Sequence, residues 1–254
     1  MTIELGPLTG AVIGIARAGG DDRELAGRIC RACVADLDIE GAALSLLTAS
    51  SSRETLAATD PTAAKLEDLQ FTMGEGACIE AAVSGSPVLI PDLQNQLLAS
   101  RWPMFATAVI EQTEVRALFA LPLQLGTINV GVIDLYRSTP GSLPVHELRD
   151  ALAATETATL SLLGLPTPTD GAPPTDGHGA DGQHADGAWP WWDGLSSDRA
   201  EVHQATGMIL AQLDIPARDA LVRLRAHAFA TSRPLADVAR DVVARRLVFT
   251  HEMD

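Results

Sequence analysis

The sequence predicts an α+β domain, in which helices flank an antiparallel sheet, followed by a small all-α domain of three helices. Three observations predict this fold class. Segments with helical and with strand periodicity alternate up to about residue 164, a stretch rich in Asp-Gly pairs and prolines follows, and three short segments with one apolar helical face come last. With 254 residues, 46% of them apolar, the chain is long enough for both units.

The α+β domain is predicted over residues 22–164, after an N-terminal extension of residues 1–21. Apolar residues recur at helical spacing over 22–38. Further helices are predicted at about 75–84, after Trp102 and at about 144–163. Strand patterns bounded by turn residues cover 41–49, 53–59, 87–92, 116–125 and 128–138. Helices at both ends of a mostly antiparallel sheet are typical of an α+β domain.

Residues 165–194 are predicted to form a flexible acidic linker. Residues 166–194 hold five Asp-Gly pairs, five prolines and no basic residue, so little of this stretch can form a regular element or a core. We expect the indoles of Trp189, Trp191 and Trp192 to dock on a neighbouring surface. The linker acids are expected to cover a basic surface that follows them; they are Asp170, Asp176, Asp181, Asp186 and Asp193.

The last unit, residues 195–254, is predicted to be three short helices. Ser197 or Asp198 can cap the first helix, Pro216 can start the second, and the third follows Thr231–Pro234. The apolar positions expected to face inward are Val202, Ala205, Ile209, Leu213, Leu221, Leu224, Ala228, Leu235, Val238, Ala239 and Val242. Helices of this length are marginal alone in water, so they must pack on one another or on a second chain.

Charge is distributed unevenly along the chain. The formal net charge is −15, which argues against a protein that coats nucleic acid along its whole length. Residues 199–249 nevertheless hold 8 arginines against 5 acids. Because charges more than about 8–10 Å apart are largely screened at physiological salt, a nucleic-acid phosphate would respond to this end of the chain rather than to the distant acids.

No membrane contact is expected, and the predicted location is the cytoplasm. The longest apolar runs, such as 11–16 and 117–125, are shorter than the roughly 18 residues that a membrane span needs. The N-terminus carries no basic cluster before its short apolar patch, so it does not resemble a secretory signal. Three cysteines do not form a disulfide framework.

Four segments of the first unit resemble, in order, the GAF sensory domains of actinobacterial regulators. They are GEGACIEAAVSGSPVLIPDL (74–93), SRWPMFA (100–106), VRALFALPLQLG (115–126) and VGVIDLYRSTPGSL (130–143). The resemblance implies a sheet of about six strands and a pocket on one face that can hold a small-molecule ligand. Candidate residues for this sensor pocket are Cys78, Trp102 and Phe105, each of which could instead be part of the core, the commoner place for such side chains.

Residues 199–243 resemble an ANTAR domain, the RNA-binding module of bacterial antitermination regulators. The resemblance is carried by Ala-x-Gly at 205–207, Ala-x-x-x-Leu-Arg at 220–225 and Arg-x-Leu-Ala-x-Val-Ala at 233–239. It implies a GAF–ANTAR transcription antitermination regulator that binds two successive RNA hairpins with hexanucleotide loops in nascent messenger RNA. A homodimer is expected, because paired hairpins suit two copies of one small module.

Candidate RNA contacts follow from side-chain chemistry. Unpaired loop bases can stack on guanidinium planes and be read on their edges by amides. Gly207 costs about 1 kcal/mol of helix stability relative to alanine, so we expect close approach there by a second helix or by RNA. Arg218 and Arg225, like Arg233 and Arg240, are seven residues apart and are expected on one helix face. The candidates are Arg199, Gln204, Gly207, Arg225, Thr231, Ser232, Arg233 and Arg240; Thr231 and Ser232 could instead simply cap the third helix.

The sequence shows no catalytic constellation, and we expect no cofactor and no metal. Cys30 and Cys33 form a Cys-x-x-Cys, but Cys78 is the only other thiol, which excludes a four-cysteine zinc site. Two alternative functions stay open. One is a thiol enzyme similar to the GAF-type free methionine sulfoxide reductases, and the other is a DNA-binding regulator whose three helices resemble a helix-turn-helix.

Overall fold

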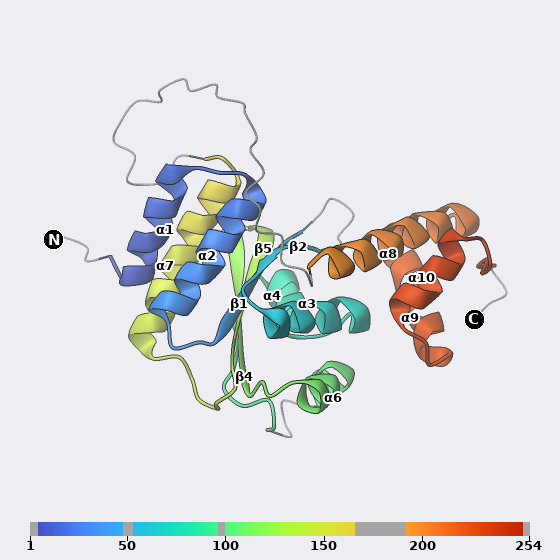
Figure 1. Cartoon of the computed structure of the whole chain (residues 1–254), viewed down its shortest axis with the longest axis horizontal. Coiled ribbons are helices and arrows are strands. Elements are labelled where there is room, and N and C mark those ends of the chain that lie inside the picture. The colour runs from blue at the N-terminus through green and yellow to red at the C-terminus, as the bar shows by residue number, and fades with distance from the viewer. Residues whose placement is uncertain (1–4, 48–52, 96–99, 166–191, 251–254) are drawn as a thin grey trace.

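The computed structural model describes residues 5–47, 53–95, 100–165 and 192–250, with the side chains of 192–198 left out (Figure 1). The helices are α1 Pro7–Ala18, α2 Asp22–Asp36, α3 Pro61–Met73, α4 Ala77–Ser84, α6 Pro103–Gln112, α7 Val145–Leu162, α8 Trp192–Leu213, α9 Ala217–Ala230 and α10 Leu235–Val243. The strands are β1 Gly41–Leu47, β2 Arg53–Ala58, β3 Val88–Ile90, β4 Ala117–Leu125 and β5 Ile128–Arg137. The predicted α+β domain and the three-helix domain after it are therefore confirmed.

The five strands form one antiparallel sheet in the order β2-β1-β5-β4-β3. Both hairpins expected from the sequence are present, with Leu44 opposite Ala57 in the first and Phe119 opposite Leu135 in the second. Among the described residues the sheet has five strands, one fewer than the GAF resemblance implies. The central position of β5 between β1 and β4 places Asp134 in the middle of the sheet.

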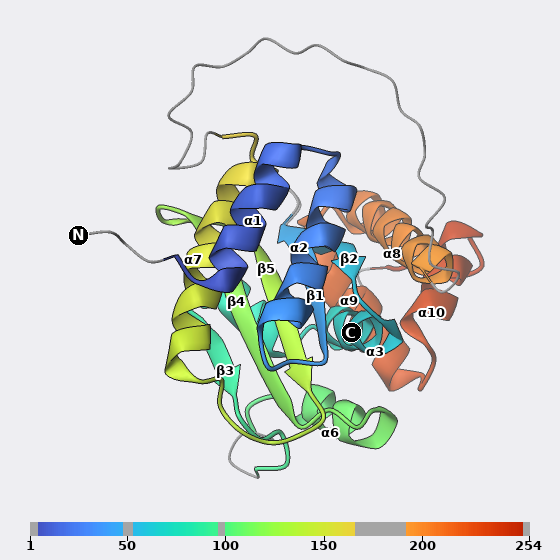
Figure 2. The ribbon, with the colours of Figure 1, turned by 60° about the vertical axis from the view of Figure 1, so that its left-hand side comes forward.

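Helices cover both faces of the sheet, as the two views show (Figures 1 and 2). Helices α1, α2 and α7 lie over one face, where Phe119 is part of their core, and α3, α4 and α6 lie over the other, where Leu118 is buried. Successive strand side chains point to opposite faces. Because both faces are covered, Ala117 to Leu123 of β4 are all buried, which explains why this strand lacks an alternating polar pattern.

Helix α1 lies in the N-terminal extension and has no counterpart in the sequence-based prediction. Its first turn is held by Asp150 of α7, whose carboxylate accepts hydrogen bonds from the backbone N–H groups of Leu8 (2.8 Å) and Thr9 (3.0 Å). The residue before the helix is Gly6, which has no side chain with which to cap it. Because the cap comes from a distant part of the chain, the only local signal for the start of this helix is Pro7 at its first position.

Helix α3 was also missed, although its signals are local. The Asp60 side chain accepts a hydrogen bond from the backbone N–H of Ala63 (2.9 Å), and Pro61 occupies the first helical position. Gly74 ends the helix with a left-handed φ of 70°. This helix carries Glu67 and Phe71, two residues on which the candidate site depends.

Helices α8, α9 and α10 pack around a separate apolar core. The inward positions predicted from the sequence are buried, apart from Leu221, which is partly buried against the same core. The predicted start of the first helix was wrong: α8 begins at Trp192, so Ser197 and Asp198 lie inside it rather than capping it. A residue that suits a cap is also tolerated within a helix, so the pattern alone did not determine the boundary. Asp193 and Trp192 belong to the first turn of α8 rather than to the linker.

Candidate functional site between the two domains

A cleft of about 1290 Å³ separates the α+β domain from the three-helix domain. Its walls come from β2, α3, α4 and the start of β5 on one side and from α8 and α9 on the other. The charged residues that line it are Arg23, Arg53, Arg199, Arg218, Arg225, Glu54 and Glu67. This excess of arginine lies within a chain of net charge −15, so the cleft is a local positive site.

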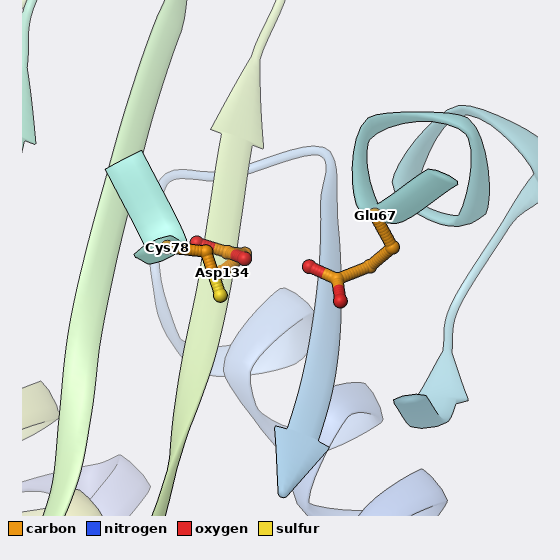
Figure 3. A group of neighbouring side chains, drawn as sticks. All are labelled: Glu67, Cys78 and Asp134. Atoms are coloured by element: carbon orange, nitrogen blue, oxygen red, sulfur yellow. The ribbon is translucent and has the colours of Figure 1, made fainter. Parts of the chain in front are cut away.

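A buried polar cluster lies beneath the cleft, between α3, α4 and the sheet. Figure 3 shows the Glu67 side chain pointing from α3 toward Asp134 of β5 and Cys78 of α4. Gln70 joins these elements: its Oε1 accepts a hydrogen bond from the Cys78 backbone N–H (2.7 Å), and its Nε2 donates to Asp134 (3.1 Å). The Arg53 guanidinium contacts the Cys78 sulfur. These five side chains are all buried.

The two carboxyl groups of this cluster have opposite protonation behaviour. Burial raises the pKa of Asp134 well above its usual range, and the neighbouring charge of Glu67 raises it further. Burial also raises the pKa of Glu67, but interactions with Asp134, Arg53 and Arg199 outweigh it and lower that pKa to about 2. Thr55 donates a hydrogen bond to the Glu67 carboxylate (2.9 Å), and Ser45 contacts it. At neutral pH the pair therefore carries one negative charge, on Glu67.

Glu67, Cys78 and Asp134 could be considered as metal ligands, since one ligand atom of each lies within 4.8 Å of the others. Metal ligation requires deprotonated side chains. Burial raises the pKa of Cys78 and of Asp134, so both hold their protons, and the Arg53 cation already lies against the Cys78 sulfur. The donor set therefore does not fit a metal ion. It fits a neutral thiol beside the Arg53 cation, and a protonated Asp134 next to the ionised Glu67.

All three cysteines are free and buried. Burial raises the pKa of Cys30 and of Cys78 well above the usual range, and raises that of Cys33 to about 12. The thiolate is the nucleophilic form of cysteine, so these thiols are poorly suited to attack a substrate at neutral pH.

Of the three candidates for a sensor pocket, Cys78 lies in the cluster beneath the cleft. Trp102 and Phe105 are 5% and 0% exposed, and their rings pack edge to face with centroids 6.3 Å apart. Both belong to the core between the sheet and α3, α4 and α6, and neither lines the cleft. Core packing, the other possibility that the sequence left open, is what the structure shows for these two rings.

The candidate RNA contacts fall into two groups. Arg199, Gly207 and Arg225 line the cleft and face the α+β domain. The remaining candidates are exposed elsewhere on the three-helix domain; they are Gln204, Thr231, Ser232, Arg233 and Arg240. The structure therefore does not gather all eight candidates on one open surface.

Arg199 and Arg225 both lie against Phe71, which is at the end of α3. Their guanidinium carbons are 5.0 Å and 5.6 Å from the centroid of the Phe71 ring, within the range of a cation–π interaction. Arg225 also donates a hydrogen bond to the Phe71 carbonyl, and Arg199 donates one to the Thr55 hydroxyl. Phe71 was not a candidate in the sequence analysis, because nothing along the chain relates α3 to α8 and α9.

Gly207 is exposed on α8, and a Cβ atom built on it would meet nothing within 4 Å. The expected approach by another helix is therefore not found within the described part of this chain. The Gln204 side chain is exposed on the same helix.

Thr231 and Ser232 do not cap the third helix, the role that the sequence left open for them. Thr231 follows α9, and its hydroxyl donates a hydrogen bond back to the carbonyl of His227 (2.7 Å), while Ser232 has a left-handed φ of 52°. Both residues thus end the second helix rather than cap the third, because Pro234 precedes the first turn of α10.

Arg233 precedes α10, so Arg233 and Arg240 do not share a helix face. Arg233 pairs with Asp241 (2.6 Å), and Arg240 pairs with Glu201 (3.2 Å) and Asp237. Their own domain therefore neutralises these exposed arginines in part. Such exposed pairs contribute little to stability, so a stronger anionic partner can replace them.

The glycines of the Gly-Glu-Gly segment shape the wall of the cleft. Gly74 has a φ of 70°, and a Cβ atom there would lie 2.9 Å from an Arg225 nitrogen. Gly76 has a φ of 132°, and a Cβ atom there would lie 2.6 Å from the Gln70 oxygen that holds the Cys78 N–H. Both backbone conformations favour glycine, and at Gly76 an added Cβ would also occupy the space that Gln70 fills.

Asp134 and Glu67 were also missed by the sequence analysis, although a carboxylate within the apolar segment GVIDLY was a readable signal. A buried acid without a local partner indicates that the fold must supply one.

Among the described residues, none of the helices is long and apolar enough to cross a membrane.

A GAF domain family model matches residues 21–162, more than half of the chain, and an ANTAR domain model matches residues 196–243. No curated protein sequence matches the chain. Residues that form the α+β domain are thus matched by the first family and those that form the helical bundle by the second.

A solved structure shows the same fold for the first domain. The chain is similar to the GAF domain of a phosphoenolpyruvate-protein phosphotransferase from Coxiella burnetii, with a TM-score of 0.50, 9% identity, and coverage of 62% of this chain and 91% of that one. For the GAF domain of the Acinetobacter phosphoenolpyruvate-protein phosphotransferase the TM-score is 0.49, with 10% identity and coverage of 62% and 91%. For free methionine-R-sulfoxide reductase from Neisseria meningitidis in complex with its substrate it is 0.47, with 11% identity and coverage of 61% and 86%. The chain belongs to the GAF family and, with an ANTAR domain after its GAF domain, has the architecture of a GAF–ANTAR regulator.

Proposed function

We propose that this protein is a cytoplasmic, homodimeric transcription antitermination regulator that binds tandem RNA hairpins with hexanucleotide loops through its ANTAR domain. The GAF domain serves as its sensor, its dimerisation module, or both. The ANTAR match over residues 196–243 is the observation that carries this proposal. A GAF domain joined to an ANTAR domain suggests a regulator rather than an enzyme.

The exposed surface of the helical bundle supports an RNA-facing role. Gln204 is exposed outside the cleft, so its amide is open to read a base edge. Gly207, one turn away, lines the cleft and has nothing within 4 Å of an added Cβ, so an RNA backbone can approach closely there. Arg233 and Arg240 add exposed guanidinium groups that can stack on unpaired bases or bind phosphate.

The chemistry of the GAF domain favours sensing over thiol catalysis. Its three cysteines are buried with raised pKa values, whereas a reductase of this type needs a reactive thiolate. The cleft is our candidate for the sensing site because residues of both domains line it, so that a small-molecule ligand there would contact both.

The test is binding of the full-length chain to a labelled RNA with two hairpins, compared with the same RNA carrying substituted loop bases. We expect the native loops to bind at least about fivefold tighter, the minimum that one lost base-edge contact of 1–3 kcal/mol implies. Unlabelled duplex DNA of similar length should compete poorly. Equal affinity for both RNAs, or efficient competition by DNA, would contradict the proposal.

A matched pair of variants assigns the loop discrimination to the ANTAR surface. Gln204→Ala should reduce the preference for native loops by about tenfold, because it removes the amide that reads a base edge. Gln112→Ala shortens an equally exposed amide at the end of α6 in the GAF domain and should change nothing.

A further inference from the structure

We infer that the GAF domain masks part of the RNA-binding surface by holding Arg199 and Arg225 against Phe71, so that the domains must separate before these arginines can contact RNA. This inference rests on the proposed function and names how that same site is regulated. The masking group is a part of the chain itself, the carboxyl end of α3.

Phe71 belongs structurally to the neighbouring domain. It is part of a GAF helix, yet it is 4% exposed and is buried in the apolar cluster formed by α8, α9 and α10 rather than in either core of the GAF domain. Its ring also packs edge to face on His203 of α8, with centroids 5.7 Å apart. Phe71 therefore connects the two domains: its backbone belongs to the GAF domain, and its ring is packed in the core of the ANTAR domain. We call this ring the plug.

The contact uses the groups of Arg199 and Arg225 that RNA would need. Each guanidinium lies over the Phe71 ring, and each donates a hydrogen bond to the GAF domain, one to Thr55 and one to the Phe71 carbonyl. A guanidinium face that covers a phenyl ring cannot stack on a base at the same time. In the closed arrangement, the guanidinium faces and hydrogen-bond donors that contact the GAF domain are therefore not available to RNA at these two residues.

The contact between the domains leaves buried donor groups unsatisfied, which lowers the free-energy cost of opening it. The Nε atoms of Arg199 and Arg225 are buried without a hydrogen-bond partner among the described residues. Burial lowers the pKa of Arg199, and lowers that of Arg225 to about 10, in line with the hydration that both guanidinium groups lose at this contact. The cleft beside the plug is unfilled by protein over about 1290 Å³, so the domains touch without a continuous packed interface.

The wall of the GAF domain is shaped for this contact. Arg225 reaches the Phe71 carbonyl past Gly74, where a side chain would collide with its guanidinium nitrogen at 2.9 Å. The exposed candidates Gln204, Arg233 and Arg240 stay outside the cleft. The masked protein thus retains a partial RNA surface, and opening completes it. The linker acids, which the sequence predicts to cover a basic surface, lie outside the residues whose side chains the structure describes.

The experiment compares full-length wild-type protein with Phe71→Ala, and uses Leu89→Ala as the matched control. Leu89 is a half-exposed apolar residue of β3 that lies outside the cleft. Removing the plug should raise the fraction of open protein and so tighten binding to the two-hairpin RNA, by about tenfold if a tenth of the wild-type molecules are open. Leu89→Ala should bind like the wild type.

Because Phe71→Ala also removes a residue from the ANTAR core, Phe71→Leu provides a second variant. Leucine preserves the apolar packing but has no aromatic face for the guanidinium groups, so it should tighten RNA binding by a smaller factor. Far-ultraviolet circular dichroism checks that both variants keep their helices.

An RNA-independent readout distinguishes this inference from the proposed function. Phenylglyoxal modifies accessible arginines, and mass spectrometry can follow Arg199 and Arg225 relative to the exposed Arg218 of α9. We expect slow labelling of the first two in the wild type and faster labelling in both Phe71 variants. Labelling that is fast from the start, or unchanged by the substitutions, would overturn the inference.

The two readouts together separate the possible failures. Faster labelling without tighter RNA binding, in a wild type that does bind RNA, would overturn the masking of an RNA site. Faster labelling when no variant binds RNA would support the interdomain contact and refute the proposed RNA-binding function.

Discussion

Asp134 is a carboxylic acid at the centre of an otherwise apolar strand, and its neighbours explain how it is tolerated. Gln70 donates a hydrogen bond to it, and burial together with the nearby charge of Glu67 raises its pKa, so it is buried as the neutral acid. Glu67 takes the negative charge because Arg53 and Arg199 face it. Since Arg199 comes from the ANTAR domain, the charge state of a GAF carboxylate is linked to the position of the other domain.

Asp134→Asn should alter the pH dependence of stability in a defined direction. Asp134 keeps its proton in the folded state, whereas in the unfolded chain it loses the proton above its ordinary pKa of about 3.9. The wild type therefore loses unfolding free energy as the pH rises above about 4, by up to about 1.4 kcal/mol per pH unit. Asparagine has no such proton, so the free energy of unfolding of the variant should increase relative to that of the wild type between pH 4 and 7, as measured in denaturant titrations.

Glu67→Gln provides the opposite sign as a control. The pKa of Glu67 is lowered to about 2, so its charge stabilises the folded state above pH 4.5 and this contribution is lost as the pH falls toward 2. The glutamine variant should be least stable relative to the wild type at neutral pH. A stability difference that does not vary with pH in either variant would contradict the protonation states assigned here.

At the scale of elements, the turn between α3 and α4 connects the buried cluster to the cleft. Gly74 ends α3 in the left-handed region, and Gly76 precedes α4 with a φ of 132°. These conformations turn Gln70 back onto the Cys78 backbone while leaving room for Arg225. The Gly-Glu-Gly motif that carries part of the GAF resemblance thus has a structural role in joining the sheet cluster to the interdomain contact.

Gly76→Ala should therefore destabilise the GAF domain. An alanine there adopts a strained backbone, which costs about 1–3 kcal/mol, and displaces Gln70 from a hydrogen bond that contributes about 1 kcal/mol. We expect the free energy of unfolding to fall by about 2–4 kcal/mol in chemical denaturation. Gly10→Ala is the matched control, because Gly10 lies within α1 with nothing within 4 Å of an added Cβ.

The control should be neutral or stabilising by up to about 1 kcal/mol, since alanine is the better helix former. Equal effects of the two substitutions would show that the conformation and close contacts at Gly76 do not matter.

At the scale of the whole molecule, two opposing fields act on an RNA that approaches. The net charge of −15 repels it at long range, whereas the arginines of the ANTAR domain attract it once it is near. The range of each field depends on salt, because the Debye length falls from about 30 Å at 0.01 M to about 10 Å at 0.1 M. Screening should therefore remove the long-range repulsion before it removes the local attraction.

The rate of association with RNA should rise, not fall, between about 10 and 100 mM salt. Stopped-flow fluorescence with the labelled two-hairpin RNA measures this rate. A variant with Glu111→Gln, Glu114→Gln and Glu156→Gln, all exposed on the GAF domain, should associate faster than the wild type at low salt and similarly at high salt. A rate that falls steadily with added salt would show instead that local attraction dominates at every distance.

The sequence by itself determined the strands of both hairpins, the helices α2, α4, α6 and α7, and the inward positions of the helical bundle. Each depends on a local pattern of apolar residues. In the strands, apolar residues alternate with polar ones or form a short run, and in the helices they recur every three to four residues, as at Val202, Ala205 and Ile209. The two resemblances were likewise carried by short continuous motifs. Local patterns suffice for such features because the interactions that form them are local.

Only the tertiary structure decided which candidate contacts are open and which are covered. Arg199 and Arg233 look equivalent along the chain, yet one lies against Phe71 and the other is exposed. Asp150 caps α1 from 142 residues away, and Glu67 meets Asp134 only because α3 crosses β5. These features depend on contacts between distant segments, and burial and charge at such contacts are properties of the packed molecule that no local pattern contains.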